Sequence, residues 1–196
     1  MMQIILTNLY IFILATLLAI LEIQIEGQHG WAKNLPAWRP SREKWYVRAY
    51  EKFMSGREFT GYHLVMFTLV LVIFHLPYVF GLTVSLEHWL KTISFFFIFI
   101  VLWDFLWFVF NPHYPLQKFK GEHVWWHKKW LAGLPVDYYG GLILSGLIFL
   151  PISLSRQTAE FFGWWLVNIL LFGVLTLLSI LFTRWVLDID SWQAKK

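Results

Sequence analysis

Residues 102–130 read LWDFLWFVFNPHYPLQKFKGEHVWWHKKW, and this stretch decides how the rest of the chain is interpreted. It places Asp104 inside an otherwise unbroken apolar segment, which ends at Asn111 and Pro112. A carboxylate in hydrocarbon costs several kcal/mol unless it is paired or lines a polar cavity. We therefore interpret Asp104 as one wall of a polar site at one face of a membrane.

The composition of the chain is that of a polytopic membrane protein. Of its 196 residues, 58% are hydrophobic and 14% are charged, whereas soluble domains are about half apolar and about a quarter charged. The chain has no cysteine, so any metal ion must be held by nitrogen and oxygen ligands. The formal net charge of +4 fits basic loops beside anionic lipid, and we do not expect nucleic acid as a partner.

Five apolar segments are long enough to cross ~30 Å of hydrocarbon, which takes about 20 helical residues. They lie near residues 4–23, 62–82, 89–110, 138–154 and 161–182. No Lys or Arg precedes the first segment, which favours a spanning helix over a signal peptide. The fourth is the shortest and contains three glycines and Pro151, so its pattern leaves open whether it crosses completely. The sequence predicts one all-α transmembrane domain, residues 1–196, built as a bundle of about five helices.

The distribution of basic residues predicts the orientation. All but two of the 16 Lys and Arg residues fall in loops 26–61 and 111–137 or after the fifth segment. Because basic loops stay in the cytoplasm, we expect a multi-pass protein of the cell (inner) membrane with its N-terminus outside and its C-terminus in the cytoplasm. Aromatic and basic residues alternate in 41–54 and 123–131, which predicts amphipathic interfacial helices in these cytoplasmic loops.

Carboxylates and histidines gather on the predicted cytoplasmic side. Glu22 and Glu26 lie one helical turn apart at the end of the first segment, close to the depth of Asp104. His123 and His127 have the spacing at which one helical face ligates one ion. Oxygen and imidazole ligands suit Fe, Zn or Mn. The candidate metal ligands are Glu22, Glu26, Asp104, His113, His123 and His127, and the candidate catalytic residues are Glu22 and Asp104.

Structural explanations compete with this interpretation. Glu22 and Glu26 could pair with Arg39, Arg42 or Arg48. Asp104 could be the buried partner of an arginine or could cap a broken helix. His123 and His127 could be interfacial polar residues. Asp137, followed by two tyrosines, is typical of an N-cap that opens the fourth span.

Two blocks of the sequence resemble a known family. The first is EIQIEGQHGWA with the following LPAWR, residues 22–32 and 35–39. The second joins DFLWF, NP, WWHKKW and PVDY between residues 104 and 138. They resemble a family of small prokaryotic polytopic membrane proteins to which no function is attached. The resemblance implies that the two blocks belong to one site, and it carries over no reaction.

The sequence thus favours a metal-dependent membrane enzyme, an oxidoreductase or a hydrolase, that acts on a lipid-soluble substrate. Two other functions stay open: a membrane scaffold or assembly subunit with buried ion pairs, and a small cation transporter. Membrane lipid is an expected partner, and a homo-oligomer or a membrane complex is compatible with the sequence.

Overall fold

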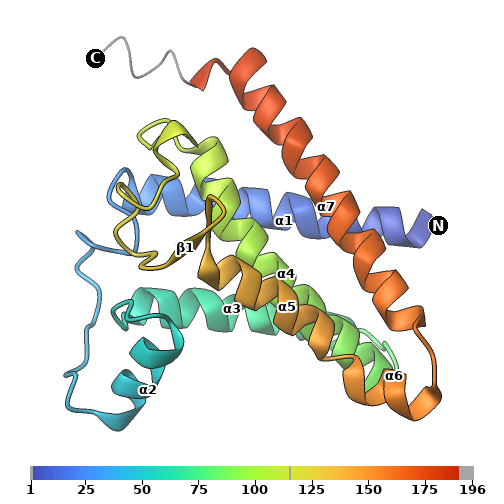
Figure 1. Cartoon of the computed structure of the whole chain (residues 1–196). Coiled ribbons are helices and arrows are strands. Elements are labelled where there is room, and N and C mark those ends of the chain that lie inside the picture. Colours follow the sequence, from blue (N-terminus) through green and yellow to red (C-terminus); the bar gives the residue numbers. More distant parts are fainter. Residues whose placement is uncertain (1, 115, 190–196) are drawn as a thin grey trace.

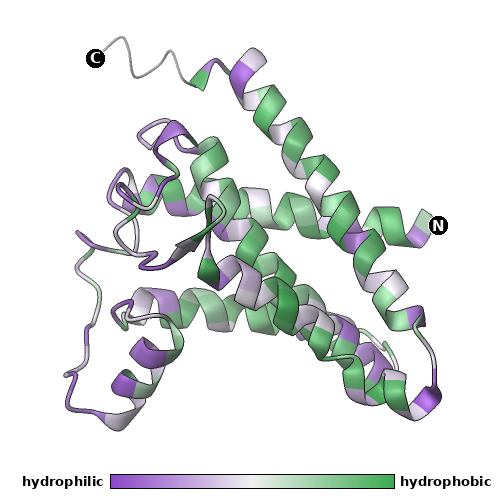
Figure 2. Ribbon diagram, viewed as in Figure 1, coloured by the Kyte–Doolittle hydropathy of each residue, from purple (hydrophilic) through white to green (hydrophobic). Residues whose placement is uncertain are grey.

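Five helices long and apolar enough to span a membrane build the described part of the chain, residues 2–114 and 116–189 of a computed structural model (Figure 1). Four of them are continuous, and the fourth in chain order is divided into two parts. They are α1 (Met2–Glu26), α3 (Gly61–Val79), α4 (Leu86–Phe110), α5 with α6 (Val136–Leu147 and Leu150–Arg156) and α7 (Glu160–Trp185). The predicted all-α membrane bundle is confirmed. Figure 2 shows apolar residues along these helices and hydrophilic residues gathered in the loops at their ends.

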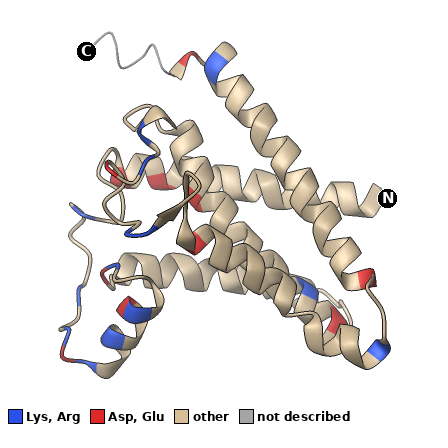
Figure 3. Ribbon diagram, viewed as in Figure 1, with Lys and Arg blue, Asp and Glu red and all other residues tan. Residues whose placement is uncertain are grey.

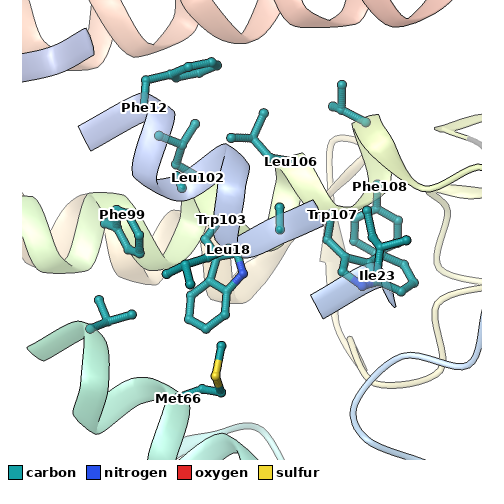
Figure 4. Close-up of a cluster of buried hydrophobic side chains, with 14 of the residues drawn as sticks. Phe12, Leu18, Ile23, Met66, Phe99, Leu102, Trp103, Leu106, Trp107 and Phe108 are labelled. Carbon is teal, nitrogen blue, oxygen red and sulfur yellow. The ribbon is translucent and has the colours of Figure 1, made fainter. Parts of the chain in front are cut away.

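Helix α4 is the centre of the bundle, and α1, α3, α5 and α7 all pack against it. More than half of its apolar window is buried, against a third or less for the other spans. Ala15 and Ala19 of α1 are fully buried, and such small side chains let two membrane helices approach closely. Figure 4 shows the resulting core, in which Phe12 and Leu18 of α1 lie beside Leu102 of α4.

The fourth span bends where its sequence pattern is irregular. Helix α5 ends at Leu147 and α6 begins at Leu150, directly before Pro151. Proline has no N–H to donate to the preceding turn and its ring clashes with that turn, which breaks the helix here. The two pieces together cover 21 residues, which is long enough to cross the membrane.

The two long loops differ from each other. Loop 27–60 contains the predicted amphipathic helix, α2 (Trp45–Phe53), which buries Val47 and exposes Trp45 and Phe53. The helix predicted for 123–131 is wrong. Residues 121–129 form turns and irregular backbone, after a short 3₁₀ helix (Leu116–Lys118), and then β1 (Trp130–Leu131) pairs antiparallel with β2 (Leu134–Pro135).

The backbone at the tip of this hairpin limits how far a helix could extend. Ala132 and Gly133 both have positive φ, 46° and 82°, as a tight hairpin turn requires and an α-helix excludes. The preceding side chains also lack helical periodicity, because Val124, Trp126 and His127 are buried whereas Trp125 between them is exposed. Tryptophans and histidines at helix-like spacing therefore belong to an irregular segment folded over the end of the bundle.

The charges of the folded chain separate along the helix axes. Figure 3 shows most Lys and Arg residues in the loops that join α1 to α3 and α4 to α5. Lys91 in the second turn of α4 and Arg156 at the end of α6 belong to the other ends of these helices. This arrangement agrees with a multi-pass protein whose basic loops share one side of the membrane.

The orientation of the chain can be measured directly. A reporter fused after Lys196 should read as cytoplasmic, and one inserted in loop 80–85 should read as external, because the basic loops stay inside. Three spans separate loop 80–85 from the C-terminus, so two reporters on the same side would contradict this number of crossings. Two reporters on exchanged sides would contradict the orientation alone.

Candidate metal site

Three potential metal ligands converge where α1 ends and α3 begins. Glu22 and Glu26 lie in the last two turns of α1, and His63 lies in the first turn of α3. One ligand atom from each lies within 4.8 Å of the other two. Glu22, Glu26 and His63 are 9%, 8% and 3% exposed, so solvent hardly reaches the group.

His63 is oriented by the residue that caps its helix. Thr60 Oγ1 accepts a hydrogen bond from the backbone N–H of His63 and lies 2.8 Å from its Nδ1. With Nδ1–H donating to Thr60, the lone pair of Nε2 is free to bind a metal, and Nε2 is 3.7 Å from Glu26 Oε1. Trp31 stacks on the imidazole with 3.9 Å between ring centroids. The ring therefore has a fixed position, and the tautomer with a proton on Nδ1 would leave Nε2 available to a metal ion.

Glu26 is held by the loop that follows α1. Its Oε1 accepts a hydrogen bond from the backbone N–H of Ala32, which has a φ of 50°. Hydrogen bonds of this kind orient ligating carboxylates and are part of most metal sites. The turn after α1 thus returns the chain to its own helix end and fixes one carboxylate.

A second polar group lies beside the first, and we call it the Asp104 cluster: Arg57, Asp104, His127, Asp137 and Tyr138. His127 Nε2 lies 3.0 Å from Asp104 Oδ2, and its Nδ1 lies 3.3 Å from Asp137 Oδ2 and 3.1 Å from Arg57 Nη2. The hydroxyl of Tyr138 donates to Asp104, and Arg57 forms an ion pair with Asp137. Four separate segments of the chain therefore meet at His127.

The position of His127 between two carboxylates governs its charge. Burial lowers the pKa of His127, but the charge of Asp104 and hydrogen bonds with Asp104 and Asp137 outweigh burial and raise the pKa above 6.5. A protonated ring donates from both nitrogens, which matches an acceptor on each side. When the ring is neutral, Nδ1 can instead accept from Arg57. His127 can therefore gain and lose a proton without leaving its position.

Both groups line one cavity of about 80 Å³. A cavity holds one water molecule from about 10–15 Å³ upward in this measure, so an ion with a few small ligands fits there. The apolar part of the lining includes Phe67, Ile100 and Val101 from α3 and α4. The indole N–H of Trp107, another lining residue, is buried with no acceptor among the described residues. The cavity thus offers carboxylates, an imidazole and an unused donor beside a hydrocarbon-like wall.

Four of the six predicted metal ligands line this cavity: Glu22, Glu26, Asp104 and His127. His113 and His123 are not among its lining residues, and His123 is exposed. The helical pair of His123 and His127 does not exist, because the segment is not a helix. A ligand role for His113 or His123 therefore stays a prediction to which the geometry adds nothing.

Sequence reasoning missed His63 and Arg57 and misinterpreted Asp137. The N-cap of α5 is Pro135, and the Asp137 carboxylate instead accepts from Ser55, at 2.7 Å, and from Arg57. The proposed partners of Glu22 and Glu26 are also engaged elsewhere. Arg39 pairs with Glu58, Arg42 with Glu51, and Arg48 donates to the Glu43 carbonyl. Within residues 2–114 and 116–189, no Lys or Arg forms an ion pair with Glu22 or Glu26.

Comparison with family models, curated proteins and solved structures found no match to this chain. The site must therefore be interpreted from its own geometry. The chain is a helical protein with five candidate membrane spans and a buried group of two glutamates and one histidine that could hold a metal ion.

Proposed function

We propose that the protein is a metal-dependent membrane enzyme that holds one divalent ion, Fe, Zn or Mn, at Glu22, Glu26 and His63. The observation that carries the proposal is the convergence of these three ligand atoms inside a cavity shared with a second, proton-exchanging group. Carboxylate and imidazole ligands suit these ions, and three protein ligands leave positions for substrate or water.

The formal charges of the cavity support an ion of this kind. Four carboxylates line it, from Glu22, Glu26, Asp104 and Asp137, and only Arg57 and a protonated His127 oppose them. With all of them ionised, two negative charges stay uncompensated in a mostly buried space. Such charges are costly unless they are paired or coordinate a metal, and one divalent ion would balance them.

His127 and Asp104 supply acid–base chemistry to this site. The ion would polarise a substrate oxygen or lower the pKa of bound water, in a hydrolytic or an oxidative reaction. Both nitrogens of His127 already have protein partners, so we assign this residue to proton transfer and not to ligation. Asp104 orients the ring and stabilises its charged form, as the carboxylate of a catalytic acid–base pair does.

The shape of the cavity supports a substrate that dissolves in the membrane. Phe67, Ile100 and Val101 lie within spanning helices, roughly one helical turn further into the membrane than His63 and Asp104. A space of about 80 Å³ admits a small polar group and excludes a whole lipid. The reacting end of a lipid-soluble molecule could enter along these apolar residues while the rest of the molecule stays in hydrocarbon.

Metal analysis tests the proposal. Protein purified without chelator should contain about one ion per chain, and His63→Ala should lose most of it, because the variant lacks one of three ligands. Thr60→Val should weaken affinity by roughly 10- to 100-fold, the usual effect of removing a group that orients a ligand. His123→Ala and His88→Ala are the controls and should keep the ion. Metal-free unmodified protein, or an equal loss in His123→Ala, would rule out this site.

A further inference from the structure

A second cavity, of about 500 Å³, lies at the end of the bundle opposite the candidate metal site. It is lined by the first turns of α1, α4 and α7 and by the last turns of α3. In Figure 1 this is the end of the bundle marked by the N-terminus. Its volume is within the range of about 300–1,000 Å³ that is typical of pockets for small ligands.

The lining of this cavity changes from polar to apolar along the helices. Gln3 and Thr7 lie near the start of α1, whereas Ile11 and Leu14 follow one and two turns further in. On α4, Lys91 and Thr92 likewise precede Phe95. A polar rim at the membrane surface above an apolar interior matches a molecule with a headgroup and a hydrocarbon chain.

The walls of the cavity are fixed by hydrogen bonds. Asn8 of α1 donates to Asn168 of α7, and both residues are 1% exposed. Tyr78 of α3 bonds Thr92 of α4 at 2.8 Å. Asn168 and Thr92 both line the cavity. The space between the helices is therefore set by polar contacts on two sides and is not a loose gap.

Lys91 is the one charged residue among those that line the cavity. Its Nζ lies 2.8 Å from Glu87 Oε1 and 5.6 Å from the ring centroid of Trp164. Glu87 also binds Arg156, at 3.0 Å. Two cations thus share one carboxylate, so Arg156 can hold Glu87 while Lys91 contacts an anion at the rim.

We infer that this cavity binds one anionic phospholipid, with an acyl chain between α1, α3, α4 and α7 and the phosphate at Lys91. The bound chain connects α3 to α7, which otherwise share few contacts. This site is separate from the proposed metal site, and neither depends on the other.

Native mass spectrometry of the full chain, released from detergent, tests the inference. The probes are phosphatidylglycerol and phosphatidylcholine with identical acyl chains, and inorganic phosphate. Phosphatidylglycerol should be retained about fivefold more tightly than phosphatidylcholine, since one lysine near an anionic headgroup contributes about 1 kcal/mol. Lys91→Gln should remove this preference, and Lys91→Arg should keep it. Phosphate alone should not be retained.

Filling the cavity provides a second, independent variant. Thr7→Phe places a ring inside the cavity and should abolish retention of both lipids. Leu17→Phe is the matched control, because Leu17 is on the same helix, is 60% exposed and lies outside the lining. Equal retention of the two lipids by unmodified protein, or full retention by Thr7→Phe, would overturn the inference. Retention of phosphate alone would show an anion site without a lipid.

Discussion

Glu22→Gln should make the metal-free protein more stable and the metal-loaded protein less stable than the unmodified protein. Without an ion, Glu22 is a buried carboxylate beside Glu26, and no described Lys or Arg pairs with it. A neutral amide avoids much of the cost of that buried charge, about 1–3 kcal/mol. With the ion present, the unmodified protein gains about 4.1 kcal/mol at a metal concentration 1,000 times the Kd, and the variant forfeits most of this, which outweighs its gain without the ion.

The opposite signs of the stability change caused by Glu22→Gln, without and with the ion, distinguish a metal site from a structural ion pair. The free energy of unfolding in mixed micelles, measured with chelator and again with saturating metal, gives both numbers for one variant. Glu43→Gln is the matched control, because the Glu43 side chain is exposed and should change neither value. A loss of stability in chelator comparable to the loss in metal would mean that Glu22 has a cationic partner, which favours the scaffold function.

The five spans were predictable because hydrocarbon imposes the same demand on every crossing. About 20 apolar residues are needed wherever a helix lies in the bundle, so length and hydropathy are sufficient. The break between α5 and α6 follows from Pro151 for the same local reason. The hairpin at Trp130–Pro135 was not predictable from aromatic spacing, because side-chain periodicity says nothing about the left-handed backbone at Ala132.

The site was predictable only where the membrane makes a residue unusual. Glu22 and Asp104 are charges inside apolar segments, and that alone identified them. His63 stands at the start of a span, where polar residues are ordinary, and only Thr60 three residues earlier hints at a fixed ring. Arg57 is one of many basic residues in its loop. Its partner Asp137 is 80 positions away, and a local pattern cannot reveal such a pair.

Asp104→Ala should lower the free energy of unfolding by about 3 kcal/mol, the lower end of the range for breaking a buried ion pair. We take the lower end because the Asp104 side chain is 26% exposed. The substitution leaves His127, whose side chain is 1% exposed, without its closest carboxylate, and it removes the acceptor of the Tyr138 hydroxyl. Asp104→Asn should cost less, since an amide oxygen can still accept from Tyr138.

The loss of unfolding free energy caused by Asp104→Ala should also depend on pH, because the variant leaves a charged His127 without its closest carboxylate partner. A pKa that is raised in the folded protein gives stability that is complete below the unfolded value of about 6.5 and disappears as the pH rises through the folded value. The difference in unfolding free energy between the unmodified protein and Asp104→Ala should therefore be largest below about pH 6.5. It should shrink above the folded pKa of His127. It should not vanish there, because Tyr138 still lacks its acceptor.

Unfolding curves between about pH 5 and about pH 9 would measure this difference across the histidine range. Glu58→Ala is the control, because Glu58 forms a half-exposed pair with Arg39 and should cost at most about 1 kcal/mol at any pH. A loss for Asp104→Ala that stays constant over the whole range would show that Asp104 contributes packing and hydrogen bonds alone. His127 would then lack the charged partner that its assignment to proton transfer requires.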